Sequence, residues 1–189
     1  MARIRTFIAV PLTDDIRGRA IALQDELART GTEVKWVEPE NLHVTLVFLG
    51  EVQDKEVPSV YRIAQEAIGG MAPFPATVEK VACFGNSRRP RTIWIGVGQG
   101  AQEMVTIHDN LETPLLDLGY RREERKFTPH ITLGRVRSDR PADSMAAALR
   151  EHAAWKGGEM TVDEIHVMGS ELTRDGPVYT VLGRAELTS

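Results

Sequence analysis

The sequence has one cysteine, no long apolar run and no excess of basic residues. Because Cys83 stands alone, an internal disulfide framework is excluded, and the lone thiol fits a reducing compartment. The apolar stretch 7–12 near the N-terminus is too short for a signal peptide, and no segment approaches the roughly 18 apolar residues of a membrane span. We therefore expect a soluble, cytoplasmic protein that does not bind membranes.

The net charge of -4 argues against a protein that coats nucleic acid without specificity, since that function usually needs a basic face. Basic residues nevertheless gather in two short segments. For any single arginine a solvated loop is the ordinary interpretation, but two basic segments in an acidic protein indicate a compact anionic ligand. The two segments contain Arg88, Arg89 and Arg91, and Arg121, Arg122, Arg125 and Lys126.

A chain of 189 residues with 42% apolar content is predicted to form one globular unit with a single core. Hydrophobic periodicity alternates between the strand and the helix pattern along the chain, which predicts an α+β fold. The predicted helices are 13–30, with Thr13 as N-cap, 54–68, 102–118 and 141–152; the predicted strands are 5–10, 41–50, 76–84, 92–97, 129–136, 160–168 and 178–187.

A short motif occurs twice. His43-Val44-Thr45-Leu46 returns as His130-Ile131-Thr132-Leu133, 87 positions later, and the segment 77–81 with Gly85 matches 161–165 with Gly169 at an offset of 84. Two copies are too few for a solenoid. We expect a single bilobal domain over 1–189 with an internal duplication and one motif in each half, at 43–46 and 130–133. Two pseudo-symmetric lobes, each an antiparallel-rich sheet with flanking helices, would surround a central cleft.

The motif combines a catalytic face with a core face. On a strand, residues two positions apart share a face, so each motif presents one imidazole and one hydroxyl together, while its apolar residues face the core. Two such pairs across a cleft suit a tetrahedral anion: the hydroxyls bind oxygens and the imidazoles move protons. With pKa values near 6.5, one histidine can be a base while the other is an acid.

With these motifs the chain resembles the two-histidine (2H) phosphoesterases, and within them the RNA 2′,3′-cyclic phosphodiesterases, also called 2′-5′ RNA ligases. The resemblance covers essentially the whole chain. It implies the 2H phosphoesterase fold and hydrolysis of RNA or oligonucleotide 2′,3′-cyclic phosphate ends to 2′-phosphomonoesters. We expect this hydrolysis to be metal-independent, because neither motif has a carboxylate on the same face, and we expect no cofactor and no obligatory protein partner. Besides the motifs, the resemblance rests on Phe7-Ile8-Ala9-Val10-Pro11, 36–42, Phe48-Leu49-Gly50, Phe127-Thr128-Pro129, Ser170-Glu171-Leu172 and 176–179.

The resemblance also implies roles for five residues. His43 would be the proton donor and His130 the proton acceptor, while Thr45 and Thr132 would hold the phosphate. Arg135 is implied as a further phosphate contact, although strict alternation turns it away from His130. That contact requires the strand to end or bulge near Gly134, where a glycine often marks a bulge.

Other interpretations stay open. The same groups could catalyse 2′-5′ RNA ligation, or the cleft could bind nucleotide or RNA without turnover. The histidines could also be metal ligands, although neither motif has a carboxylate on the same face. Arg91 and Trp94 are weaker candidates for contacts to the rest of the nucleotide. His108 and His152 are expected to be structural, His166 could line the cleft, and all three are left outside the site.

Overall fold

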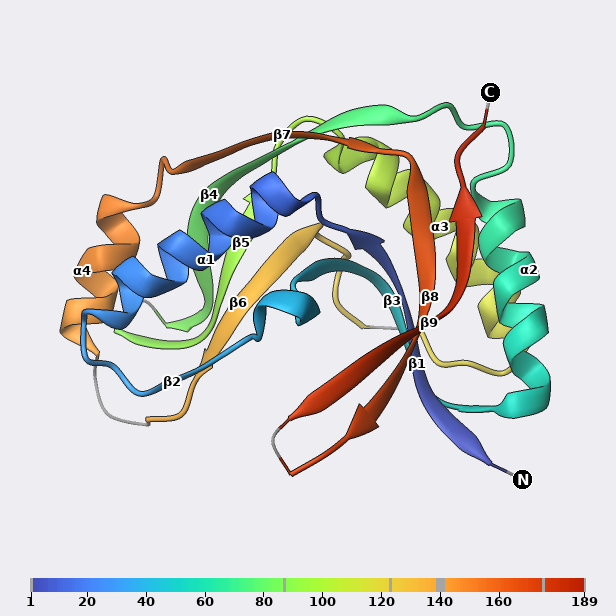
Figure 1. Cartoon of the computed structure of the whole chain (residues 1–189), viewed down its shortest axis with the longest axis horizontal. Coiled ribbons are helices and arrows are strands. Elements are labelled where there is room, and N and C mark those ends of the chain that lie inside the picture. The colour runs from blue at the N-terminus through green and yellow to red at the C-terminus, as the bar shows by residue number, and fades with distance from the viewer. Residues whose placement is uncertain (1, 87, 123, 139–141, 175, 189) are drawn as a thin grey trace.

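The computed structural model contains a curled, nine-stranded antiparallel sheet with helices packed against it (Figure 1), so the predicted α+β class is confirmed. It describes residues 2–86, 88–122, 124–138, 142–174 and 176–188. The strands are β1 (Arg3–Pro11), β2 (Val34–Trp36), β3 (His43–Gln53), β4 (Phe74–Asn86), β5 (Arg89–Val97), β6 (His130–Val136), β7 (Lys156–Val162), β8 (Glu164–Leu172) and β9 (Pro177–Glu186). The α-helices are α1 (Asp14–Ala28), α2 (Val57–Ala67), α3 (Ala101–Asp117) and α4 (Asp143–Glu151), with short 3₁₀ turns at Pro39–Asn41 and Asp54–Glu56.

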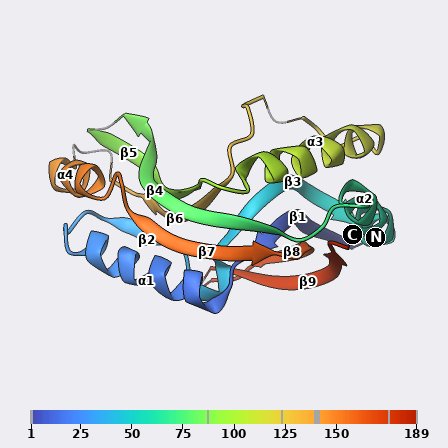
Figure 2. The same ribbon diagram turned by 90° about the horizontal axis from the view of Figure 1, so that it is seen from above.

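The two lobes are the two ends of this one sheet. Its strand order is β7-β4-β5-β6-β3-β1-β8-β9. The short strand β2 lies outside this order and pairs with β6. We call β1, β3, β8 and β9 the β1 lobe, and β2, β4, β5, β6 and β7 the β5 lobe. In Figures 1 and 2, β2, β5 and β6 lie towards one side of the molecule and β1, β8 and β9 towards the other, while β4 and β7 run across between them. The lobes join where Val44 of β3 pairs with Ile131 of β6, so the two motif strands lie side by side at the centre.

Each lobe combines strands from both halves of the sequence. Equivalent strands make equivalent pairs: Ala9 of β1 lies between Thr45 and His166, and Trp94 of β5 lies between Thr132 and Ala82. Corresponding residues of the two sets are separated by nearly the offsets found in the sequence repeat. However, β4 belongs to the β5 lobe, whereas its counterpart β8 belongs to the β1 lobe. The internal duplication stays a prediction. The repeated register of the strand pairs favours it.

Several predicted boundaries were wrong. The expected strand 160–168 is two strands, β7 and β8, because β7 pairs with β4 in one lobe and β8 with β1 in the other. The strand expected from position 41 begins at His43, after the 3₁₀ turn that contains Pro39. The short strand β2 was not predicted, since three residues carry no periodicity. Thr13 occupies the N-cap of α1 without a side-chain cap hydrogen bond, and Pro141, the expected start of the last helix, lies outside the described residues.

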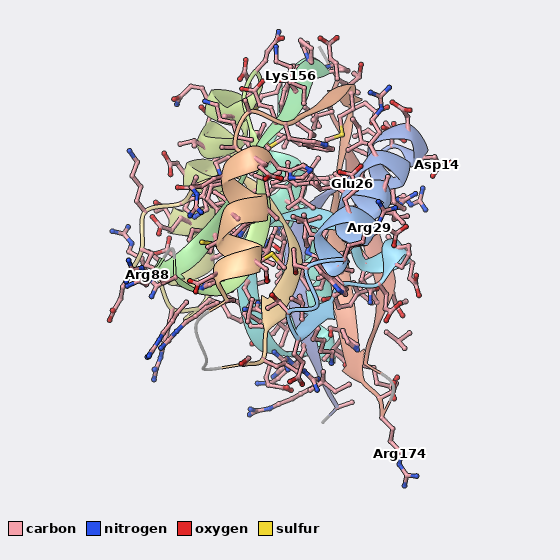
Figure 3. All side chains as sticks on the ribbon, turned by 90° about the vertical axis from the view of Figure 1, so that its left-hand side faces the viewer. Asp14, Glu26, Arg29, Arg88, Lys156 and Arg174 are labelled. Atoms are coloured by element: carbon pink, nitrogen blue, oxygen red, sulfur yellow. The ribbon has the colours of Figure 1, made fainter. Side chains whose placement is uncertain are left out.

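The core lies between the sheet and the helices that pack on it. The apolar residues that predicted α1 and α3 are all buried, as are the apolar residues of both motifs. Charged side chains such as Asp14, Arg88 and Arg174 extend outward (Figure 3). No helix among the described residues has the length and apolarity needed to cross a membrane. The buried residues in question are Ile16, Ala20, Leu23 and Leu27 of α1, Met104, Ile107, Leu111 and Leu115 of α3, and Val44, Leu46, Ile131 and Leu133 of the motifs.

Candidate active site

Both motif histidines line one cavity of about 370 Å³ over the junction of the lobes. Thr45 and Thr132 line the same cavity, as the alternation of β3 and β6 predicts. Their apolar neighbours in the motifs are buried on the other face of the sheet. The tertiary structure therefore brings together the four motif residues that the sequence placed 87 positions apart.

The backbone holds both imidazoles in the same way. His43 Nδ1 lies 2.7 Å from the carbonyl oxygen of Asn41, and His130 Nδ1 lies 2.7 Å from that of Thr128. A carbonyl oxygen only accepts hydrogen bonds, so each Nδ1 carries the proton and donates it. The Nε2 atom of each ring is left as the nitrogen that can take up or release a proton.

His43 lies in the more enclosed surroundings. Its Nε2 lies 2.8 Å from Thr45 Oγ1, and in the neutral ring this nitrogen accepts the hydroxyl proton. Phe7 stacks on the imidazole with ring centroids 4.9 Å apart, and Tyr179 meets it edge-on at 5.6 Å. Burial lowers the pKa of His43 from 6.5; the bond to the Asn41 carbonyl opposes this shift, and the charge of His130 adds to it.

His130 has a similar aromatic environment from the other lobe. Phe84 and Trp94 stack with centroids 5.1 Å apart, and both meet the His130 ring edge-on, at 5.2 and 5.9 Å. His130 also lines a second, neighbouring cavity, and Trp94 lines neither of the two. Its buried indole nitrogen has no hydrogen-bond partner among the described residues, and the indole packs against the His130 ring.

A β-bulge brings Arg135 to the motif face. In the pairing of β6 with β5, Gly134 opposes Ile93 and Thr132 opposes Trp94, so Leu133 is skipped. The extra residue restores Arg135 to the face of Thr132, and both line the cavity. The first motif has the same feature, because the pairing of β3 with β1 skips Leu46.

Polar contacts satisfy the carbonyl that the bulge frees. The Leu133 oxygen accepts hydrogen bonds from Val37 N at 2.8 Å and from Nε2 of the buried Gln24 at 2.9 Å. Gly134 leaves room for β2, because a Cβ there would lie 2.6 Å from Val34 Cγ1 and 2.9 Å from Trp36 Cε3. The bulge is thus held by α1 and β2 together.

Sequence reasoning missed several residues of the cavity. Arg5 and Lys35 add positive charge to that of Arg135, opposed by Glu38. Lys35 could not be found, because β2 was not predicted. Phe7 and Tyr179 lay in segments that supported the family resemblance, and only the fold showed that they touch His43.

The remaining histidines lie outside both cavities beside the motifs. His166 is buried, with its Nε2 2.7 Å from Glu164 Oε1, and His152 Nε2 lies 2.9 Å from Glu26 Oε2. His108 stacks on Phe127 at 4.3 Å. In the part of the chain that the structure describes, no three His, Cys, Asp or Glu side chains are grouped to hold a metal ion.

Comparisons with known proteins agree on a family. The family model of the 2′-5′ RNA ligase superfamily matches residues 14–174. The chain is 34% identical over 178 residues to an RNA 2′,3′-cyclic phosphodiesterase of Methanothermobacter thermautotrophicus, covering 94% of this chain and 96% of the relative. It is 35% identical over 173 residues to the enzyme of that name from Aeropyrum pernix, covering 91% and 97%.

Solved structures share the fold over the full length. A protein of Thermus thermophilus superimposes with a TM-score of 0.82 and 28% identity, covering 97% of this chain and 98% of the other. Escherichia coli LigT complexed with 3′-AMP gives a TM-score of 0.78 with 25% identity, and each chain is covered completely (100%). The bilobal sheet is therefore a fold common to this group.

Proposed function

Because the chain belongs to the 2′-5′ RNA ligase superfamily, we propose that it is a cyclic phosphodiesterase that opens the 2′,3′-cyclic phosphate at an RNA or oligonucleotide end. The product is the 2′-phosphomonoester. Relatives named RNA 2′,3′-cyclic phosphodiesterase that align with nearly the whole chain support the substrate class.

The observation that carries the proposal is the matched anchoring of the two imidazoles. Each Nδ1 donates to the carbonyl oxygen two residues before it, so each neutral ring offers Nε2 as its basic atom. Binding a phosphate would need cations and hydroxyls alone. Two proton-transfer groups lining one cavity are what general acid and general base catalysis requires.

In the mechanism, His130 Nε2 takes a proton from water as the water oxygen attacks phosphorus. The bond between phosphorus and the 3′ oxygen breaks, and His43 Nε2 gives its proton to that leaving oxygen. Attack and departure occur on opposite sides of phosphorus, which suits histidines contributed by the two lobes. The phosphate stays attached through the 2′ oxygen.

Thr45, Thr132 and Arg135 hold the non-bridging oxygens. The Thr45 hydroxyl, bonded to His43 in the free enzyme, can turn to a phosphate oxygen when the anion enters. The guanidinium of Arg135 adds charge-assisted hydrogen bonds. An anion in this position also favours the imidazolium form of His43, which prepares it to act as the acid.

The test is to incubate the protein with an RNA oligonucleotide that ends in a 2′,3′-cyclic phosphate and to identify the product by phosphorus NMR. We expect the 2′-phosphate from the native chain and almost none from His43→Ala. A 3′-phosphate would mean that the substrate sits in the opposite orientation between the two lobes, with its 2′ oxygen as the leaving group. Tight binding without any hydrolysis would instead establish a non-catalytic binding module.

Metal-independent catalysis is a further part of the proposal. Among the described residues, one carboxylate, that of Glu38, lines the cavity that contains both histidines, which offers little support for a typical catalytic metal site. Activity is expected to survive exhaustive EDTA treatment, with the rate measured on a 2′,3′-cyclic nucleotide. Loss of activity in EDTA and its recovery with zinc or manganese would show that the histidines act as metal ligands.

A further inference from the structure

A second cavity, of about 560 Å³, opens directly beside the catalytic one. His130, Thr132 and Arg135 line both. We call the second cavity the arginine groove; its other lining residues are Phe84, Gly85, Asn86, Arg89, Arg91, Thr92 and Arg125.

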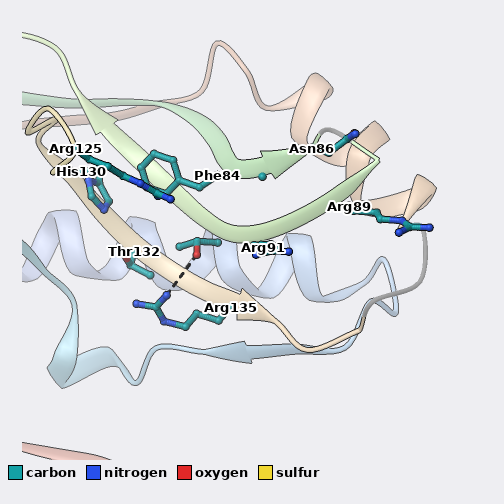
Figure 4. A pocket seen from close by; sticks show the side chains of 10 residues that line it. Phe84, Asn86, Arg89, Arg91, Arg125, His130, Thr132 and Arg135 are labelled. Carbon is teal, nitrogen blue, oxygen red and sulfur yellow. Dashed lines mark hydrogen bonds between the residues drawn. The ribbon is translucent and has the colours of Figure 1, made fainter.

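Three separate segments supply the arginines of the groove. Arg89 and Arg91 come from the start of β5, Arg125 from the segment before β6, and Arg135 from β6 itself (Figure 4). The pairing of β4 with β5 skips Arg91 opposite Gly85, whose φ is +103°. A Cβ on Gly85 would lie 3.0 Å from the Arg89 oxygen, so this position requires glycine.

The groove has strong positive charge. Among the described residues that line it, none is Asp or Glu. In the described part of the chain, none of its four arginines forms an ion pair; Arg135 Nη1 lies 3.5 Å from Thr92 Oγ1. Four guanidinium groups that pair with no carboxylate among the described residues form a site for a ligand with several negative charges.

The shape of the groove distinguishes an extended anion from a compact one. Along β5, Arg89 lies at the hairpin end, Thr92 opposes Arg135, and Gly96 opposes His130. Gly96 lies seven positions after Arg89 along β5, a length of roughly 23 Å at about 3.3 Å per residue. Figure 4 shows the same order, with Arg91 between Arg135 and Arg89. A single phosphate is much shorter than this row of arginines. The compact anionic ligand expected from the sequence therefore does not account for the length of the groove.

We propose that the arginine groove binds the RNA strand on the 5′ side of the cyclic phosphate, an inference that rests on the proposed function. The cyclic phosphate occupies both the 2′ and the 3′ oxygen of the terminal ribose. The strand can therefore leave the catalytic cavity only through its 5′ oxygen. Its successive phosphodiesters then lie along Arg91 and Arg89, so the enzyme prefers an oligonucleotide to a cyclic mononucleotide.

The experiment compares substrates of increasing length. The kcat/KM values of Arg89→Ala, Arg91→Ala and the double variant are measured on 2′,3′-cyclic AMP, on its 5′-phosphorylated form and on an RNA octamer with a cyclic end. We expect a loss of about five- to tenfold per arginine on the octamer, since each removes a charge-assisted phosphate contact. Hydrolysis of 2′,3′-cyclic AMP should stay within twofold of the native rate, which also shows that the variants fold.

Arg62→Ala is the matched control, because Arg62 is an exposed arginine on α2, in the other lobe. It should leave all three substrates unaffected. Octamer kinetics unchanged in the double variant would overturn the inference. A loss on the 5′-phosphorylated mononucleotide as large as that on the octamer would also overturn it, because the groove would then hold a single phosphate.

Binding measured without turnover separates this inference from the proposed function. The Kd of a fluorescein-labelled RNA octamer with a 2′-phosphate end is followed by anisotropy over a range of salt concentrations. Each lost contact should reduce the slope of log Kd against log salt by about 0.7, the value for single strands. A native enzyme that hydrolyses nothing yet shows this slope change would contradict the proposed function alone. An unchanged slope in an active enzyme would contradict the groove alone.

Discussion

The two motif histidines have the same backbone anchor but different surroundings. The contact from His43 to Asn41 lies partly inside the protein, and Asn41 is itself buried and bonded to the Pro177 oxygen at 2.9 Å. The corresponding contact of His130 is exposed to solvent. An imidazole that is shielded from water is more easily kept neutral, so the empty site favours a neutral His43.

Titration of His43 by NMR tests this difference. Its pKa is lowered by burial, so in the free protein the midpoint should lie below 6.5, and the ring is neutral above that pH. Inorganic phosphate should move the midpoint to higher pH, because a nearby anion favours the imidazolium.

His152 provides an internal control for this titration. The hydrogen bond to the Ala148 carbonyl, together with Glu26, raises the pKa of His152, so its midpoint should lie above 6.5. Added phosphate should leave that midpoint unchanged. A free-enzyme midpoint of His43 at or above 6.5 would contradict the prediction. The His43→Asn spectrum assigns the signal.

Removal of either imidazole should have a large effect on catalysis. We expect His43→Ala and His130→Ala each to lower kcat on a 2′,3′-cyclic nucleotide by about 10² or more, the usual contribution of a general acid or base. The double variant should be little worse than either single one, since the two groups act as a unit. His152→Ala, outside the site, should keep near-native turnover. Substantial activity in either single variant would remove that histidine from the mechanism.

Among the elements, β2 and the bulge in β6 determine where Arg135 lies. The three residues of β2 pack so closely on β6 that only glycine fits at Gly134. Two residues of β2, Lys35 and Trp36, line the cavity of the motif histidines as well. A short strand that sequence analysis could not find therefore shapes this cavity beside Arg135.

Gly134→Ala tests this arrangement. The added Cβ meets Val34 and Trp36 below 3.0 Å, so β2 must move, at an expected cost of about 1–3 kcal/mol in the free energy of unfolding. A lower kcat should accompany this loss. Gly18→Ala is the control: no atom lies within 4 Å of its Cβ position in α1, and alanine there should stabilise by up to about 1 kcal/mol. Urea unfolding measures both, and equal stability of the two variants would contradict the role assigned to Gly134.

At the scale of the whole molecule, the chain passes repeatedly between the lobes. Helix α1 follows β1 but packs on β7 and α4, whereas α3 follows β5 but packs on β3 and α2. The β4 and β8 strands are likewise exchanged between the halves. Neither lobe can complete its core without segments from both halves of the sequence.

This interlocking predicts one cooperative unfolding transition. All three tryptophans (Trp36, Trp94 and Trp155) lie in or beside strands of the β5 lobe, so their fluorescence reports on that lobe, while far-UV circular dichroism reports on the whole chain. The two urea curves should coincide. A tryptophan transition at clearly lower urea than the dichroism change would show that the β5 lobe unfolds alone.

The sequence by itself determined the features that repeat at short range. Period-two alternation assigned each motif its catalytic and its core face, and helical periodicity identified the buried residues of α1 and α3. The four motif residues could be named because a histidine and a threonine two positions apart must share a face. The resemblance to a known family added Arg135 and the division of roles between the histidines.

Only the tertiary structure decided which strands pair and which residues they skip. The bulges at Leu46, Leu133 and Arg91 depend on neighbouring strands and on glycines at close contacts, so strict alternation turned Arg135 to the wrong face. The split of 160–168 into β7 and β8 follows from pairing with two different lobes. The arginine groove likewise exists only because distant segments meet. Such contacts arise from the packing of the whole chain, which the periodicity of a single segment does not record.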